Sequence, residues 1–435
     1  MSSDLSADSS QLVDRRMALA REWDELVDQV RQIPGFEDFL RAPRLEALLP
    51  AARCGPVVVV NVSRYRCDAI IVTTEGVEVE ELADLTAADV EQRTGDYLRV
   101  LQVAEQAVWE LFDARRQFDD GDRSPASIRR YTAAKHAYIK TQGEMEAELG
   151  AVAEWLWDCI ADPVLTKLGF ADTPQPGRPF PRLWWCPTGL LNLLPLHAAG
   201  YHGSSEHPPR TVLDRVVSSY TPTLRALLDA SRATDVPPDD QRMLIVAVHD
   251  VADQVPLQAV AGERDLLTRL FTDRYTLLES DAATWEKVRS ELPRHCWVHF
   301  SCHGGQDLTD PSRGGLLLHD RTLTVGDVSS AQYHGEFAFL SACKTATGGV
   351  TLADEVITLA AALHYTGYRH VIGTLWSVYD NSAGEIAETV YSELTSSGEF
   401  SPSRSAYALH TAIKRLRDAD HSRLSAWMPF AHTGP

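Results

Sequence analysis

Two short apolar segments of the sequence end on an imidazole and a thiol. Residues 298–305 read Val-His-Phe-Ser-Cys-His-Gly-Gly, and residues 337–346 read Phe-Ala-Phe-Leu-Ser-Ala-Cys-Lys-Thr-Ala. Each segment is strand-like until it reaches His303 or Cys343 and the small residues beside it. Side chains at the carboxyl ends of neighbouring parallel strands gather at one edge of a sheet. The pattern therefore predicts His303 as a base beside Cys343 as a nucleophile.

Each of these residues has a simpler interpretation when it is taken alone. A cysteine at the end of a strand is usually a small core residue, because cysteine is among the most buried residue types. The joint pattern favours chemistry, since Gly304 and Ala342 leave room for a substrate backbone to approach. Alternation along the strand points Cys302 to the opposite face from His303, so we interpret Cys302 as a core residue. We interpret His299 as a packed strand residue and not as a second base.

The composition is that of a soluble globular protein with more than one domain. The chain has 435 residues, of which 44% are hydrophobic and 23% are charged. This length is sufficient for two or three domains, each with its own core. The formal net charge of −20 disfavours direct binding to nucleic acid or to an anionic membrane, and it is compatible with a basic substrate.

The cysteines and the apolar runs indicate a reduced, cytoplasmic protein. The seven cysteines are scattered and contain no CxxC pair, so we expect neither a disulfide framework nor a structural zinc site. A metal site built from His299, His303, His319 and Asp320 would match no familiar ligand spacing. No nucleotide-binding glycine motif follows a strand, and we expect no metal and no cofactor. No signal peptide and no membrane-length apolar run is visible.

The order of the elements predicts four regions. Long helices from Thr86 to about Phe118 and over residues 127–162, joined by a polar loop, form a helical hairpin. After a polar, proline-containing linker, strands and helices alternate, which is typical of an α/β fold with a mostly parallel sheet covered by helices on both faces. One of these helices is expected over residues 352–365, with Thr351 as its N-cap. The regions are 1–54, a helical arm; 55–233, a first lobe with the hairpin; 234–241, the linker; and 242–435, a second lobe.

From about residue 55 onwards, the sequence resembles the CHAT domain family of the caspase-like and separase-like cysteine peptidases. The resemblance implies a caspase-like sheet in the second lobe and a degenerate protease-like first lobe before it. It assigns the base to His303 and the nucleophile to Cys343. The tetratricopeptide repeats often attached to this family are not visible. The matching segments are residues 185–197, 220–224, 300–304, 340–345, 370–380 and 429–430.

These assignments predict a cysteine endopeptidase that works by acyl transfer. The backbone N–H groups of Gly304 and Cys343 are the expected oxyanion donors. The segment ending at Asp380 resembles the separase segment whose aspartate receives an arginine, which implies a preference for Arg or Lys at P1. Asp380 has an equally weighted alternative as the N-cap of a helix beginning near Ser382. Asp307 and Asp310, in the loop after His303, are the other acidic candidates.

The serious alternative is a catalytically silent CHAT-type scaffold, because a fold does not by itself imply activity. Under the peptidase hypothesis the partners are a protein substrate and a regulatory protein. An unrestrained cytoplasmic endopeptidase would be toxic, so we expect low basal activity. We expect the regulatory protein to bind the helical arm or the helical hairpin and to shift the loops around Cys343.

Overall fold

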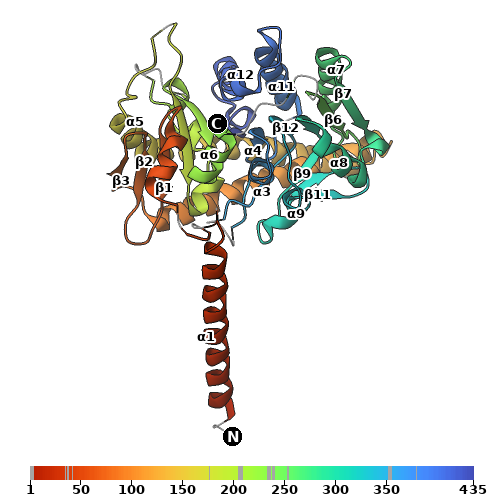
Figure 1. The fold of residues 1–435 in the computed structure, drawn as a ribbon. Helices are drawn as coiled ribbons and strands as arrows, with labels where there is room; N and C mark the ends of the chain where they lie inside the picture. The colour runs from red at the N-terminus through yellow and green to blue at the C-terminus, as the bar shows by residue number, and fades with distance from the viewer. Residues whose placement is uncertain are drawn as a thin grey trace. The chain divides into compact units, whose positions relative to one another are not determined.

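The chain forms two compact units, residues 1–50 and residues 51–435. Figure 1 shows the fold in a computed structural model. The side chains of residues 4–14 and of Asp380 lie outside the description, although their backbone is included. The described residues are 4–34, 36, 39–41, 43–175, 177–203, 209–232, 237, 241–251, 254–350, 355–378 and 380–435.

The first unit consists mainly of one long helix. Helix α1 spans Asp4–Arg31, and the short helix α2 spans Leu45–Leu48. The last residue of α1, Arg31, pairs with Asp28 at 3.0 Å, and its Nε donates a hydrogen bond to the carbonyl oxygen of Phe39 at 2.9 Å. The arm boundary predicted at residue 54 falls just past the end of this unit, and the function of the arm stays a prediction.

The second unit is built on an eleven-stranded sheet with the order β3-β2-β1-β4-β5-β14-β13-β12-β8-β6-β7. Most neighbouring strands are parallel; the antiparallel pairs are β1 with β2, β2 with β3, and β13 with β14. The strands of this sheet are β1 (Val57–Asn61), β2 (Asp68–Val72), β3 (Val77–Glu81), β4 (Arg182–Pro187), β5 (Val217–Tyr220), β6 (Met243–Ala247), β7 (Tyr275–Glu279), β8 (Trp297–Ser301), β12 (Phe337–Ser341), β13 (His370–Thr374) and β14 (Phe430–Thr433).

The last strand joins the two halves of the sheet. Strand β14 pairs with β13 on one side and with β5 on the other. The indole of Trp184 in β4 reinforces this seam by donating a hydrogen bond to the carbonyl oxygen of Gly434 at 2.7 Å. Strands from both predicted lobes therefore share one sheet. The division between the lobes stays a prediction, because most of the linker region 234–241 lies outside the described residues.

Helices cover both faces of the second half of the sheet. Alternate residues of β6, β8 and β12 enter two separate cores, one beneath α7 and α11 and the other beneath α8, α9 and α10. This confirms the predicted α/β fold with a large, mostly parallel sheet. The helices of the second unit are α3 (Ala87–Asp119), α4 (Pro125–Leu156), α5 (Asp162–Lys167), α6 (Leu224–Arg232), α7 (Ala259–Phe271), α8 (Trp285–Glu291), α9 (Val325–Ser329), α10 (Leu359–Tyr365), α11 (Asp380–Thr395) and α12 (Ser405–Ala419).

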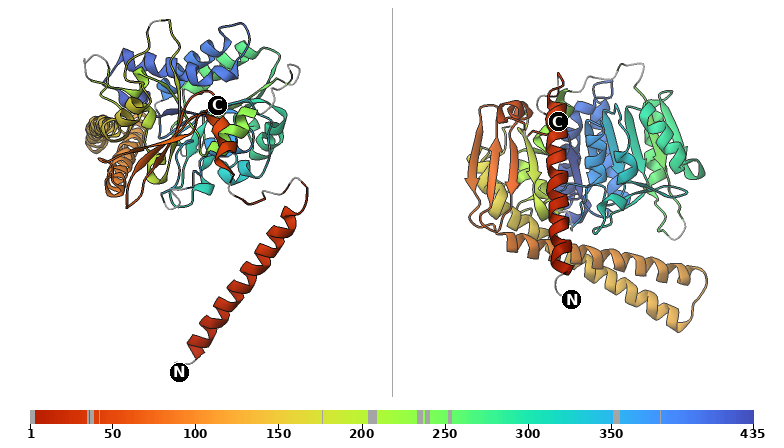
Figure 2. Two further views of the ribbon diagram at one scale, coloured as in Figure 1. Left: turned by 60° about the vertical axis from the view of Figure 1, so that its left-hand side comes forward. Right: turned by 60° about the horizontal axis from the view of Figure 1, so that its bottom comes forward.

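Helices α3 and α4 form the predicted antiparallel hairpin, which Figure 2 shows in orange along one edge of the sheet. The hydroxyl of Thr86 caps α3 by accepting a hydrogen bond from the Asp89 N–H. The two helices are linked by a 2.6 Å ion pair between Arg130 and Asp113. The ring of Tyr97 on α3 meets that of Trp376, just after β13, edge to face at a centroid distance of 5.9 Å.

A second, three-stranded sheet lies beside the main one. It contains a β-hairpin, formed by β10 (Gly315–Leu317) and β11 (Thr322–Thr324), and a third strand, β9 (His303–Gly305), that the sequence did not suggest. His303 therefore lies in a strand that follows β8 after one residue. The register pairs His303 with Leu317 of β10.

The helix predicted over residues 352–365 is shorter than expected. Helix α10 begins at Leu359, and its N-cap is Thr358, whose hydroxyl accepts a hydrogen bond from the Ala361 N–H. The predicted cap Thr351 lies outside the described residues. Just before α10, the carbonyl of Ile357 accepts a hydrogen bond from the Gln306 side chain at 3.2 Å, so a tertiary contact replaces the helical one.

Candidate active site

The strands that lead to His303 and Cys343 are direct neighbours. Strands β8 and β12 are parallel, and their register pairs Ser301 with Ser341. The Cys302 N–H continues this pairing by donating to the Ser341 carbonyl at 3.4 Å. Strand β13 lies on the other side of β12. The carboxyl ends of these three strands thus meet at one edge of the sheet.

Gly304 is packed against the backbone of Cys343. A Cβ atom built on Gly304 would lie 2.4 Å from the carbonyl oxygen of Cys343, 3.2 Å from its nitrogen and 3.3 Å from the Cβ of Ala342. The sequence suggested that Gly304 leaves room for a substrate. The structure gives a more local reason for glycine, because the Cys343 backbone already occupies the space that a side chain would need.

His303 is oriented by a backbone carbonyl. Its Nε2 lies 2.9 Å from the carbonyl oxygen of Val255, in the segment that precedes α7. A carbonyl oxygen can only accept a hydrogen bond, so Nε2 carries the proton. In the neutral ring, Nδ1 is then the nitrogen that can take up a proton. A general base needs one ring nitrogen that carries no proton, and in this tautomer that nitrogen is Nδ1.

The half-buried Cys343 thiol has several polar neighbours that act on it in opposite directions. Burial raises the pKa of the Cys343 thiol, and its hydrogen-bond contacts with the Val378 N–H and with the Ser377 side chain act to lower it. The charge of Glu105 also raises this pKa, whereas that of Lys344 lowers it. The resting site therefore holds a thiol at neutral pH, with groups nearby that can stabilise a thiolate.

The residues after Cys343 are held on β13. The Thr374 hydroxyl donates to the Ala342 carbonyl at 2.7 Å, and the Thr374 N–H donates to the Thr345 hydroxyl at 2.9 Å. The Ala346 N–H donates to the Thr374 carbonyl at 2.8 Å. These bonds fix the direction in which the chain leaves β12, and with it the position of the thiol.

A buried carboxylate from α7 ties the two candidate catalytic strands together. Glu263 accepts a hydrogen bond from Ser341 of β12 at 2.8 Å and another from Ser301 of β8. The Nε2 atom of His299 lies 3.0 Å from the same carboxylate, and Nδ1 lies 3.0 Å from the Tyr391 hydroxyl. His299 is thus a packed residue, as expected. Sequence reasoning missed Glu263, whose only signal was an acidic residue at an inward-facing position of α7.

The three predicted acidic residues are in different situations. In the structure, Oδ1 of Asp307 accepts hydrogen bonds from the Thr309 hydroxyl and from the N–H groups of Thr309 and Asp310, which lower the pKa of Asp307. Asp310 accepts a hydrogen bond from Ser312 at 2.5 Å. Both therefore stabilise their own loop. Asp380 begins α11, but its side chain lies outside the described part of the structure.

With this geometry, a comparison with known proteins identifies the family. The sequence model of the CHAT domain family matches residues 150–435, well over half of the chain. The protein belongs to the CHAT domain family. No curated protein sequence matches it significantly. The match begins near the end of α4, so β1, β2, β3 and α3 lie outside the matched part of this CHAT protein.

Solved structures support the caspase-like fold of this CHAT domain. A Saccharomyces cerevisiae separase, solved in complex with securin, superimposes with a TM-score of 0.58 at 9% identity, covering 89% of this chain and 30% of that one. A second structure of that complex superimposes with a TM-score of 0.57 at 10% identity, covering 90% of this chain and 31% of that one. The chain thus spans about a third of the separase length. Porphyromonas gingivalis gingipain RgpB superimposes with a TM-score of only 0.43 at 10% identity, covering 67% of this chain and 76% of that one.

Three of the four groups considered for a metal site hold other partners in the CHAT domain. His299 and His303 have the contacts described above, and Asp320 accepts a hydrogen bond from the Trp285 N–H at 2.8 Å. Within the described ranges, no three His, Cys, Asp or Glu residues are grouped to hold a metal ion. No described helix has the length and apolar character needed to cross a membrane.

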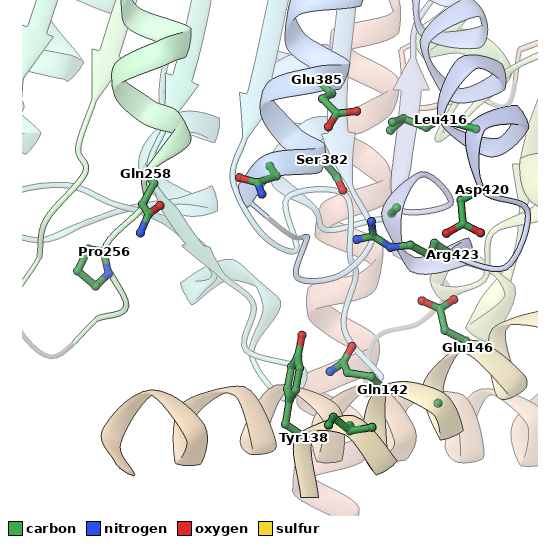
Figure 3. A pocket seen from close by; sticks show the side chains of 15 residues that line it. Tyr138, Gln142, Glu146, Pro256, Gln258, Ser382, Glu385, Leu416, Asp420 and Arg423 are labelled. Atoms are coloured by element: carbon green, nitrogen blue, oxygen red, sulfur yellow. The ribbon is translucent and has the colours of Figure 1, made fainter. Parts of the chain in front are cut away.

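A cavity of about 740 Å³ lies beside the segment that holds His303. Two of the residues that line this cavity are Pro256, which directly follows Val255, and Asn381, which directly follows Asp380. Figure 3 shows Tyr138, Gln142 and Glu146 projecting from α4 on one side, with Ser382, Glu385, Asp420 and Arg423 on the other. The Glu146 carboxylate accepts hydrogen bonds from the hydroxyl and the N–H of Ser425. The cavity thus connects the helical hairpin with segments that border the candidate active site.

Proposed function

We propose that this CHAT domain is a cysteine endopeptidase in which His303 and Cys343 form the catalytic pair. The observation that carries the proposal is the packing of Gly304 against the Cys343 backbone. It brings the residue after His303 into contact with the nucleophile's own peptide unit. Val255 supports the same assignment, because its carbonyl leaves Nδ1 of His303 as the proton acceptor.

In this reaction, Nδ1 of His303 takes the proton of the Cys343 thiol, and the sulfur attacks a peptide carbonyl carbon. The N–H groups of Gly304 and Cys343 stabilise the oxyanion. The C–N bond then breaks, the departing amine takes the proton from His303, and a thioester remains on Cys343. Water, activated by His303, hydrolyses this thioester and restores the thiol.

The proposed substrate is a protein cleaved after Arg or Lys. Asp380 is the primary candidate for binding the basic side chain, and Asp307 and Asp310 are the alternatives. The cavity beside this region carries three acidic residues, Glu146, Glu385 and Asp420, against one basic residue, Arg423, and this balance favours a basic segment. The net charge of −20 acts in the same direction over a longer range.

The proposal includes control by a regulatory protein. Burial raises the pKa of the Cys343 thiol, which supports a low basal reactivity that a partner could relieve. The similar separase was solved in complex with securin, and a comparable partner is proposed here. The same raised pKa also favours the second candidate function, a catalytically silent scaffold whose thiol is merely a buried side chain.

Labelling and cleavage together test the proposal. A peptide-directed electrophile with Arg at P1 should modify Cys343 in the wild-type protein. A diverse peptide library, offered with and without cell extract, should be cleaved by the wild type. Cys343→Ala and His303→Ala should each abolish cleavage while leaving the melting temperature nearly unchanged, and the double variant should lose little more. Full cleavage by Cys343→Ala would overturn the assignment, and a wild type that is neither labelled nor active would favour the scaffold.

A further inference from the structure

One residue of the helical hairpin reaches two of the polar neighbours of the Cys343 thiol. Glu105 lies halfway along α3, and its Oε2 atom lies 2.6 Å from Nζ of Lys344, the residue next to Cys343. Its Oε1 atom accepts a hydrogen bond from the Ser377 hydroxyl at 2.8 Å. The Ser377 hydroxyl is itself a hydrogen-bond neighbour of the thiol. All of these contacts lie where α3 passes the carboxyl ends of β12 and β13.

We propose that Glu105 controls the reactivity of Cys343 by engaging the Lys344 ammonium and the Ser377 hydroxyl proton. The inference rests on the proposed peptidase function and adds to it a positioning residue outside the catalytic pair. Glu105 also lies outside the residues matched by the CHAT family model. The control therefore comes from the helical hairpin.

The chemistry of a hydroxyl explains how Glu105 acts through Ser377. A serine hydroxyl has one proton to donate. When that proton is donated to Glu105, the Ser377 oxygen can only accept a hydrogen bond from the Cys343 thiol. Ser377 then lowers the pKa of the Cys343 thiol less than it would if its proton were donated to the sulfur. If Glu105 is removed, Ser377 can donate its proton to the sulfur and stabilise a thiolate.

Lys344 provides the second route. An ammonium group beside a cysteine favours the thiolate, and a carboxylate paired with that ammonium cancels much of its effect. The charges of Lys344 and Glu105 indeed shift the pKa of the Cys343 thiol in opposite directions. Lys344 also has φ of 59°, a left-handed conformation that residues other than glycine rarely adopt. The ion pair with Glu105 helps to hold it there.

The test measures alkylation of Cys343 by a small neutral haloacetamide as a function of pH, with the modified peptide quantified by mass spectrometry. Glu105→Gln keeps the size of the side chain and removes its charge. It should shift the alkylation profile to lower pH and raise the rate at pH 7 by roughly three- to tenfold. Glu110→Gln makes the same charge change on the exposed face of α3 and should leave the profile unchanged.

Two further variants keep the test independent of folding defects. Lys344→Met leaves Glu105 unopposed beside the sulfur and should shift the profile to higher pH. Adding Ser377→Ala to Glu105→Gln should remove part of the gain, because the amide is a weaker acceptor than the carboxylate and leaves the Ser377 proton more available to the sulfur. A Glu105→Gln profile that equals the wild-type profile, or lies at higher pH, overturns the proposal. An equal shift in Glu110→Gln also overturns it, since a general charge effect would then suffice.

The alkylation readout separates this inference from the proposed function, because it requires no peptide cleavage. A wild type that cleaves no peptide, combined with the expected alkylation shift, would disprove the peptidase and leave the role of Glu105 intact. Peptide cleavage by the wild type without a shift of the alkylation profile in Glu105→Gln would support the peptidase and disprove the role of Glu105. In an active enzyme, the acid limb of the pH profile of kcat/KM should move to lower pH in Glu105→Gln, together with the alkylation profile.

Discussion

Gly304 and Cys343 are in backbone contact, so close that a Cβ atom on Gly304 would lie 2.4 Å from the Cys343 carbonyl oxygen. The obstacle is backbone, which cannot rotate away as a flexible side chain can. Any residue other than glycine must therefore separate the end of β12 from β9. The relative position of His303 and Cys343 depends directly on this contact.

Gly304→Ala should consequently lose most of its catalytic activity. A displacement of about 1 Å between catalytic groups can cost about a hundredfold in rate, and we expect a loss of kcat/KM of that order. The matched control is Gly305→Ala, because nothing lies within 4 Å of a Cβ atom built at Gly305. Peptide cleavage by purified variants with similar melting temperatures provides the measurement. Wild-type kcat/KM in Gly304→Ala would show that the contact does not position the pair.

The sequence was sufficient to predict which strands would meet. Both candidate catalytic residues end local apolar segments, and the ends of neighbouring parallel strands must converge. Local pattern also predicted the helical hairpin. The position of β14 could not be predicted in this way. Its four residues carry no signal that they join β13 to β5.

The supporting contacts could not be predicted, because they join residues far apart in the chain. His303 binds the carbonyl of Val255, 48 positions earlier, and Lys344 binds Glu105, 239 positions earlier. A backbone carbonyl has no sequence signature, and an acidic residue on a long helix normally indicates a solvated surface. Tertiary contacts likewise shortened α10, although its capping pattern suggested an earlier start.

Glu263 should contribute strongly to stability. Its buried carboxylate accepts hydrogen bonds from Ser301 and Ser341 and contacts His299, so removing it leaves several buried polar groups without a partner. Glu263→Ala should lower the free energy of unfolding by about 3–5 kcal/mol, measured by urea denaturation. The control Asp265→Ala removes an exposed carboxylate from the same helix and should change it by less than about 0.5 kcal/mol. Equal losses in both variants would contradict the prediction.

Two buried histidines, one on β13 and one on β14, should make the protein sensitive to acid. His370 and His432 are both buried, and Nδ1 of His370 lies 3.2 Å from Nε2 of His432. The Ser219 hydroxyl of β5 lies 2.7 Å from Nδ1 of His432. Burial lowers the pKa of His370 to about 3 and that of His432 well below its usual value. The unfolded chain binds protons on these rings near pH 6.5. Stability should therefore fall as the pH drops from about 6.5 towards 3.

Replacing one imidazole tests this assignment. His432→Gln removes a group that the unfolded state protonates and the folded state does not, so the free energy of unfolding should depend less steeply on pH between 6.5 and 4. His136→Gln, on the exposed face of α4, should leave the slope unchanged. Chemical denaturation at a series of pH values supplies the measurement. An unchanged slope in His432→Gln would show that other groups cause the acid sensitivity.

The last prediction concerns substrate preference at P1. Strand β13 lies next to β12, so the segment after β13 leaves the sheet beside Cys343 and leads to Asp380. A carboxylate there would pair with a basic P1 side chain, bidentately with arginine. In peptides that differ only at P1, the wild type should favour Arg or Lys over Ala, Leu and Asp by at least about tenfold.

Asp380→Ala should remove this preference and leave the alkylation rate of Cys343 unchanged. Asp307→Ala and Asp310→Ala are the matched comparisons, because their carboxylates already accept hydrogen bonds within their own loop and should contribute less to selectivity. Loss of selectivity in Asp307→Ala or Asp310→Ala, with Asp380→Ala unaffected, would move the pocket to the loop after His303. A wild-type preference for Asp or for a bulky apolar residue at P1 would contradict a basic-residue pocket altogether.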